Sequence, residues 1–473
     1  MYVAGDEING EMQFGRYYRT VELYVIIKNI ICKAAIVILT GGLLCGCARQ
    51  SDMPKQDNQS EQVGTSGQTG QFELDILSEQ ADMSEQAGQS EQTSQLNEIE
   101  DQVQLQEEEI LKNVDAYEVE GKSNITIRMV GDVLLHTPVE DAACSDEDGT
   151  YDFSYIFQNT RDLIEEADVA MVNQEVIIGG EELGISGYPA FNAPTAVGDA
   201  LVDAGFDVIM HATNHALDKG KRGILNCLDF WNSTYPDIIV LGIHDFQEEH
   251  SAVSFIDIND ITIAVLNYTY GTNGIPLPED MPYAVDMLVE DVVTSDITYA
   301  KEHSDFIIVA PHWGTEYRLE PDSYQDKWTD VFLHNGVNLV IGTHPHVIEP
   351  IELIKDEEND QEMLVYYSLG NYVNWTSGTG DGIANRMVGG MADIELSVEM
   401  SQDGLDKKVS IADYGVTALI TDLRAGDNGV TVYKLSEYNE AMAKDNEIIK
   451  QDSKFSYEYC VNLCNQIWGE DWR

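Results

Sequence analysis

The chain has 473 residues, 43% of them hydrophobic, so it is long enough to bury a large core and to contain more than one domain. Its 84 acidic and 26 basic side chains give a formal net charge of -58 at pH 7. This bias argues against non-specific binding of nucleic acid or anionic lipid headgroups. It also disfavours a polyanionic substrate unless local cations overcome the field, and its simplest interpretation is solubility at a cell surface.

Residues 1–47 have the pattern of a bacterial lipoprotein signal peptide. Lysines precede the apolar stretch 34–44, which is too short to span a bilayer comfortably. Leu44 and Gly46 then stand at positions -3 and -1 before Cys47, as in a lipobox. We therefore predict lipidation of Cys47 and a lipid-anchored protein on the extracellular face of the cell membrane. The alternative is an uncleaved N-terminal anchor.

Residues 48–122 are predicted to form a disordered linker rich in Gln, Ser and Glu. The segment has few apolar residues, so it cannot bury enough surface to offset the entropy lost on ordering. Residues 95–113 carry enough spaced apolar side chains for a short acidic helix.

Strands and helices alternate through residues 123–400. Strands are predicted at 125–130, 169–172, 208–210, 238–241, 306–310, 339–341 and 363–368, with an antiparallel pair at 253–258 and 261–268. Helices are predicted at 153–167, 195–204, 220–235, 285–303 and 322–335. This alternation predicts an α/β fold with β-sheet covered by helices. Residues 401–473 are predicted to add antiparallel strands and a polar helical tail.

Carboxylate, amide and imidazole side chains, which bind divalent metals, gather just past several predicted strands. Ligands in α/β folds bind beyond the carboxyl ends of the strands, so these side chains are expected to converge at one sheet edge. The candidate metal ligands are Asp132, His136, Glu175, Asn214, His215, His312, His344 and His346. Orientation of a ligand is the alternative role of His136, and substrate contact is an alternative for Glu175.

Six segments in this order resemble the CapA family of capsule-synthesis proteins, also called poly-γ-glutamate biosynthesis proteins. They are residues 131–132, 173–175, 214–220, 312–317, 342–346 and 368–372. That family is similar to the calcineurin-like metallophosphatases, which hold two metals with Asp, Asn-His, His and Gly-His-x-His ligands. The chain departs from that pattern at Thr343, which separates Gly342 from His344, and at Glu175, where the phosphatases carry an aspartate.

The resemblance implies a metallophosphatase-like layered sandwich that holds divalent metal ions, two of them, of the Mn, Zn, Fe or Mg class. It implies a part in the synthesis, export or anchoring of an anionic envelope polymer such as poly-γ-glutamate, with a membrane polymer-synthesis complex as partner. The site would be a metal-dependent hydrolase or transferase. The alternatives are a metallophosphoesterase acting on an envelope or nucleotide phosphate, and a non-catalytic polymer-binding scaffold.

Two groups of residues complete the predicted site. Metal sites of this kind supply hydroxide from a bound water at neutral pH, and His312 or Asp218 would position that water or act as an acid. The candidate substrate-binding residues are Arg318 and Arg386, which follow motif loops, and Asn371, which lies within the last motif. Ordinary solvated surface charge is the alternative for the two arginines.

Overall fold

The computed structural model describes residues 123–145, 147–248, 250–356, 361–375, 377–400, 407–425, 429–470 and residue 472. The predicted signal peptide, the lipidated Cys47 and the linker at 48–122 lie outside the described residues. Among the residues that are described, no helix combines the length and the hydrophobicity needed to cross a membrane.

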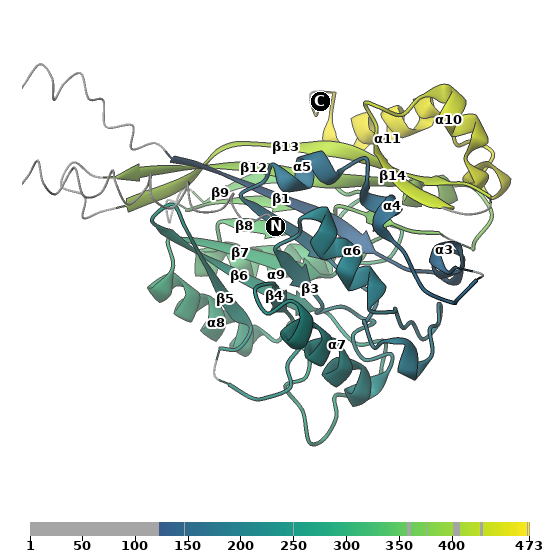
Figure 1. Ribbon diagram of the computed structural model, residues 1–473. Coiled ribbons are helices and arrows are strands. Elements are labelled where there is room, and N and C mark those ends of the chain that lie inside the picture. Colours follow the sequence, from purple (N-terminus) through teal and green to yellow (C-terminus); the bar gives the residue numbers. More distant parts are fainter. Residues whose placement is uncertain are drawn as a thin grey trace, which may run out of the picture. The chain divides into compact units, whose positions relative to one another are not determined.

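The larger of two sheets has the strand order β14-β13-β12-β1-β2-β3-β4, with β11 beside β1 (Figure 1). Its strands are β1 (Ser123–Val133), β2 (Val169–Asn173), β3 (Val208–Met210), β4 (Ile239–Leu241), β11 (Asn371–Val373), β12 (Val388–Met400), β13 (Lys407–Leu423) and β14 (Val430–Lys434). Strands β1 to β4 are parallel, so their carboxyl ends share one edge. Strands β13 and β14 extend the same sheet.

The smaller sheet has the order β5-β6-β7-β8-β10-β9. Its strands are β5 (Val253–Ile258), β6 (Ile261–Thr269), β7 (Phe306–His312), β8 (Leu339–Ile341), β9 (Ile351–Asp356) and β10 (Gln361–Tyr366). The central strands β6, β7, β8 and β10 run parallel. The sequence prediction missed β9, whose half-exposed residues lack a continuous apolar run.

Three buried clusters define four layers. One lies between the sheets and includes Ile127 of β1 and Ile308 of β7. A second covers the outer face of the larger sheet and includes Trp231, and the third covers the smaller sheet and includes Trp328. The helices are α3 (Thr137–Ala143), α4 (Ser154–Phe157), α5 (Arg161–Glu165), α6 (Ala196–Ala204), α7 (Gly220–Thr234), α8 (Glu290–His303), α9 (Ser323–Asn335), α10 (Glu440–Asp445) and α11 (Tyr457–Trp468). Helices α8 and α9 pack on the smaller sheet and the others on the larger, which confirms the α/β layered class.

Three predicted helices differ from the structure. The helix expected at 153–167 is broken, because buried Thr160 bonds the Phe157 carbonyl and contacts the Tyr372 hydroxyl through its own hydroxyl. Helix α8 begins five residues later than expected, because the residues before it pair with other strands as isolated bridges. The predicted polar tail buries an apolar face of α11 that includes Cys460 and Leu463.

Candidate metal centre

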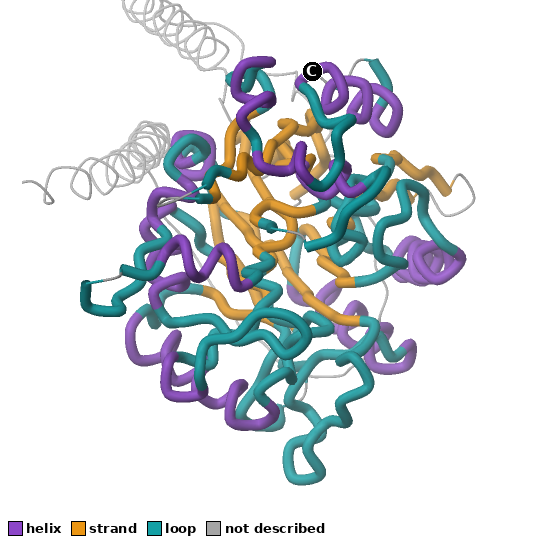
Figure 2. The backbone as a smooth tube through the Cα atoms, turned by 90° about the vertical axis from the view of Figure 1, so that its right-hand side faces the viewer, coloured by secondary structure: helices purple, strands orange, loops and turns teal. Residues whose placement is uncertain are grey.

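Side chains from the carboxyl ends of both sheets meet in one buried cluster. The larger sheet supplies Asp132 at the end of β1 and Glu175 just after β2. The smaller sheet supplies His312 at the end of β7, and His344 and His346 from the loop after β8. Figure 2 views the molecule from the side toward which β1 points in Figure 1, where loops lie across the strand ends. The predicted ligands thus converge from the strand ends of two sheets, and not from one edge of a single sheet.

Five of these side chains form two triads whose ligand atoms lie within 4.8 Å of one another. One triad is Glu175, His312 and His344, and the other is Asp132, Glu175 and His346. All five side chains are buried. Carboxylate oxygen and imidazole nitrogen are the donor set that Mn, Zn and Fe accept. The Glu175 carboxylate belongs to both triads.

Glu175 supplies the test of whether a cation fits. Neither oxygen of its fully buried carboxylate has a hydrogen-bond partner among the described residues. The nearest imidazole nitrogens, His346 Nε2 and His312 Nε2, lie 3.6 and 3.7 Å from Oε1. Burial, opposed by His346 and reinforced by Asp132, raises the pKa of Glu175 well above its usual range. A buried carboxylate in this state is costly unless a cation binds it, so the residues present fit a metal ion.

Asp132 is positioned by the strand change at the end of β1. β1 pairs with β12 up to Val130 and with β11 at Asp132, and the backbones come so close that a Cβ on Gly131 would lie 1.9 Å from the Gly370 carbonyl oxygen. The Asn173 amide donates to Asp132 Oδ1 at 2.8 Å, and the His344 backbone N–H donates to Oδ2 at 3.3 Å. Glycine at position 131 is therefore a steric requirement of the site.

The imidazoles differ in charge. Burial, followed by the other histidines, lowers the pKa values of His312 and His344 well below their usual range, so both are neutral and suited to metal ligation. Burial would also lower the pKa of His346, but Glu175 and Asp132 outweigh it and raise the value to about 9. His346 Nδ1 faces Asp132 Oδ2 at 3.1 Å, which leaves Nε2 toward Glu175.

The loop after β8 holds its histidines in an uncommon backbone conformation. His344 has φ 99° and His346 has φ 59°, although neither is glycine. A Cβ on Gly342 would lie 2.1 Å from the Tyr367 carbonyl oxygen, so the start of the loop also has no room for a side chain. Positive φ at non-glycine residues costs energy and clusters at functional sites. The fold therefore stabilises the backbone conformation that places both imidazoles.

His215 and Asp218 form a pair beside the two triads and belong to neither of them. Asp218 Oδ2 lies 2.6 Å from His215 Nδ1 and also accepts the Phe191 backbone N–H at 2.8 Å. The Phe191 and His215 rings pack edge to face, with their centres 4.6 Å apart. The Asp218 carboxylate thus holds the His215 imidazole in one orientation.

Two other predicted ligands lie near the triads without joining them. The Asn214 amide oxygen lies 3.1 Å from His312 Nε2. His136 is half-buried at the start of α3, against Phe191, and burial together with His346 and His215 lowers its pKa to about 4. Both side chains are therefore in the immediate surroundings of the triads.

The three predicted substrate-binding residues have different surroundings. Arg386, in the 3₁₀ helix Ile383–Met387, is half-buried and stacks on Tyr317. Asn371 is buried and bonds within the protein. Arg318 is exposed and donates to the Pro321 carbonyl at 3.4 Å.

Sequence reasoning assigned no role to three residues that contact the site. Asn173 anchors Asp132, and its place beside Glu175 at a strand end was a usable signal. The ring of Tyr270 packs 4.6 Å from that of His344, and Asn273 lies within hydrogen-bonding distance of Asn214 and His215. Both follow β6, whose end carries no typical ligand, so no pattern pointed to them.

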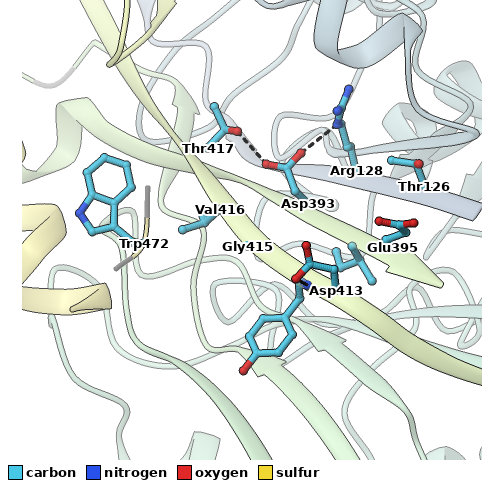
Figure 3. Close-up of a pocket in the computed structure, with 11 residues that line it drawn as sticks. Thr126, Arg128, Asp393, Glu395, Asp413, Gly415, Val416, Thr417 and Trp472 are labelled. Carbon is cyan, nitrogen blue, oxygen red and sulfur yellow. Dashed lines mark hydrogen bonds and ion pairs between the residues drawn. The ribbon is translucent and has the colours of Figure 1, made fainter. Parts of the chain in front are cut away.

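A separate hollow of about 620 Å³ lies on the outer face of the larger sheet (Figure 3). Arg128, one of its lining residues, donates to Asp393 Oδ1 at 2.8 Å, and the Thr417 hydroxyl donates to Oδ2 at 2.7 Å. The Arg128 cation is thus already paired, and the residues that line the hollow form no cluster like the two triads.

Comparison with curated proteins gives two capsule-related relatives. The PGA biosynthesis protein CapA of Bacillus subtilis is 31% identical over 189 residues, which cover 37% of this chain and 45% of that protein. The capsule biosynthesis protein CapA of Bacillus anthracis is 25% identical over 266 residues, covering 53% and 61%. The chain thus spans about half the length of the curated relatives it matches.

A calcineurin-like phosphoesterase of Bacillus subtilis, YfkN, is among the similar solved structures, with a TM-score of 0.35 and 14% identity over 72% of this chain and 99% of that one. The family model for the bacterial capsule synthesis protein PGA_cap matches residues 126–376, more than half of the chain and all of the strand ends that supply the two triads. The motif resemblance is thereby confirmed, and the chain belongs to the PGA_cap family.

Proposed function

We propose that this protein takes part in the synthesis, export or anchoring of poly-γ-glutamate or a related envelope polymer, through a metal-dependent hydrolase or transferase site. Family membership supports the polymer role. One observation carries the site: the buried Glu175 carboxylate has no hydrogen-bond partner among the described residues and is shared by two triads of ligand atoms. Such an arrangement suits two neighbouring cations with a bridging carboxylate.

The residues around the triads have distinct tasks in this proposal. Glu175, His312 and His344 would hold one ion, and Asp132, Glu175 and His346 the other. Bound metal would lower the pKa of a water and polarise the bond to be cleaved. Asp218 fixes His215 so that its second ring nitrogen is available for proton transfer. The Arg386 cation would bind an anionic part of the substrate.

A metallophosphoesterase acting on an envelope or nucleotide phosphate is the second candidate. The net charge of -58 favours it, because a small phosphate enters an acidic protein with less repulsion than a chain of carboxylates. We further propose that Cys47 carries a lipid anchor that places the site outside the cell membrane, beside the membrane complex that makes the polymer.

Metal analysis and activity assays on the full chain test these functions together. Metal content is measured first, and then turnover of phosphoesters and of γ-glutamyl amides by the wild type, Asp132→Ala and His344→Ala. His334→Ala, an exposed histidine on α9, is the control. Amide turnover lost in both site variants supports the polymer enzyme, whereas phosphoester turnover lost in both supports the second candidate. Protein without metal and without a change in either variant would refute both.

A further inference from the structure

The Arg386 side chain lies at a fixed place beside the two triads. Its guanidinium carbon is 3.5 Å from the centre of the Tyr317 ring. Arginine stacks on aromatic faces with both cation–π and planar contact, and such stacking restricts the side chain. Arg386 is half-buried, so part of its surface still reaches solvent.

Tyr317 is itself fixed to the loop that carries His344 and His346. Its backbone N–H donates to the Pro345 carbonyl at 2.7 Å, and its ring centre lies 6.0 Å from that of His346. Its φ of 67° is a genuine outlier for a bulky side chain. The fold therefore maintains a costly conformation that holds this ring under the guanidinium.

Asn371 connects the backbone of Arg386 to the same loop. Its amide nitrogen donates to the carbonyl oxygens of His346 and Arg386, both at 3.0 Å. Its amide oxygen lies 3.0 Å from His346 Nδ1. The amide is buried, so we assign Asn371 a linking role instead of the substrate contact that its sequence position suggested. Asn371 and Tyr317 thus each connect Arg386 to the loop that carries His344 and His346.

The charged side chains around Arg386 indicate which kind of substrate suits the site. The Arg386 cation stacks on Tyr317, whose ring centre lies 6.0 Å from that of His346, so this positive charge stands beside one of the triads. The Glu316 carboxylate carries the opposite charge; it directly precedes Tyr317 in the chain and is exposed. A substrate that approaches the triads therefore meets one cation, Arg386, and one carboxylate, Glu316. A single oxyanion suits this pair, whereas a run of carboxylates would repel Glu316.

We propose that Arg386 is the oxyanion-binding group of this site, that Tyr317 positions it, and that the site takes a substrate with one terminal phosphoryl or carboxylate group. This rests on the proposed function, because it assumes that the substrate reaches the two triads. It deepens that function by placing recognition at a chain end or a small ester, not along the interior of a polyanion.

Calorimetric titration of the full chain tests the proposal, first with inorganic phosphate and then with butyrate and with triglutamate, each with native metal and after chelation. Arg386→Gln is expected to weaken binding of the preferred anion about tenfold or more, since a charge-assisted hydrogen bond is lost. Arg386→Lys should recover only part of the affinity, because ammonium lacks the planar stack. Tyr317→Leu should weaken binding and Tyr317→Phe should retain it. Arg222→Gln, at an exposed arginine paired with Glu182, is the matched control.

The outcomes separate this proposal from the proposed function. Metal content and thermal unfolding are measured on every variant, so that a folding defect is seen directly. A wild type without metal refutes the proposed function, while the chelated titration still tests Arg386. Equal affinity in wild type and Arg386→Gln, or no anion binding by the wild type, overturns the role of Arg386. Equal affinity in wild type and Tyr317→Leu overturns positioning by Tyr317. Preference for triglutamate over both butyrate and phosphate overturns the single-oxyanion class.

Discussion

At the residue scale, Glu175 accounts for most of the chemistry of the candidate site. Its carboxylate lies in the interior with imidazoles at 3.6 and 3.7 Å and no hydrogen-bond donor among the described residues. Sequence reasoning selected Glu175 from its place after a strand. It could not show that the side chain is shared by two triads, because sharing depends on which residues face it from the other sheet.

Glu175→Gln is expected to separate stability from metal binding. In chelator, the variant should be more stable than the wild type by about 1–3 kcal/mol, because the raised pKa of Glu175 makes folding at neutral pH protonate this carboxyl or bury its charge, and an amide needs neither. In added Mn²⁺ the wild type should gain stability and the variant should not. Thermal unfolding measures both. Glu181→Gln, exposed at the start of the 3₁₀ helix Glu181–Leu183, is the control, and a gain with Mn²⁺ equal in all three proteins would contradict the expectation.

Glu349, which belongs to neither triad, is expected to make the stability of the protein depend on pH. Its Oε2 accepts from the Gln325 amide at 2.5 Å, Oε1 has no partner among the described residues, and burial raises its pKa to about 8. When the pKa of a carboxyl is raised in the folded state, the protein loses stability as the pH rises from the unfolded-state pKa toward the folded-state pKa.

Glu349→Gln should therefore remove part of the stability loss between about pH 4.5 and pH 8, on the order of 3 kcal/mol at the upper end. Denaturant unfolding across this range measures the difference from the wild type. Glu352→Gln, exposed on β9, should leave the pH profile unchanged. Parallel profiles for wild type and Glu349→Gln would show that this carboxyl is not perturbed.

At the element scale, the strand ends are what the sequence predicted best. Short apolar runs bounded by polar residues marked β2, β3, β7 and β8 within a residue or two, because buried parallel strands need such runs. The helix at 153–167 was less predictable. Its apolar spacing is helical, but the Thr160 hydroxyl contact with Tyr372 is a long-range interaction that no local pattern reports.

Gly131→Ala tests the strand change that presents Asp132. The added methyl group would overlap the Gly370 carbonyl, so the free energy of unfolding should fall by about 3 kcal/mol or more. Gly415→Ala in β13, where no atom lies within 4 Å of the new Cβ, should cost far less. Denaturation midpoints give both values. Similar losses in the two variants would refute the steric role of Gly131.

At the scale of the whole molecule, the site exists because two sheets end together. Asp132 and Glu175 come from one sheet, and His312, His344 and His346 from the other. The order of the motifs was readable along the chain. Their division between sheets was not, because a buried parallel strand has the same composition in either sheet.

The proposed membrane attachment through Cys47 would concern the whole chain. If Cys47 is lipidated, inhibition of lipoprotein signal peptidase in the producing cell should leave a heavier, uncleaved precursor. Immunoblotting of the membrane fraction measures the shift, and Cys47→Ser should give the precursor without inhibitor. A chain of unchanged mass under both treatments would refute lipidation.

Metal content of the purified full chain, measured by elemental mass spectrometry, tests the central claim most directly. The wild type and Glu181→Gln should retain divalent metal in stoichiometric amounts. Glu175→Gln should lose most of it, because both triads share Glu175, whereas His344→Ala and Asp132→Ala should each lose only part. Equal metal content in the wild type and Glu175→Gln, or no metal in either, would contradict the account.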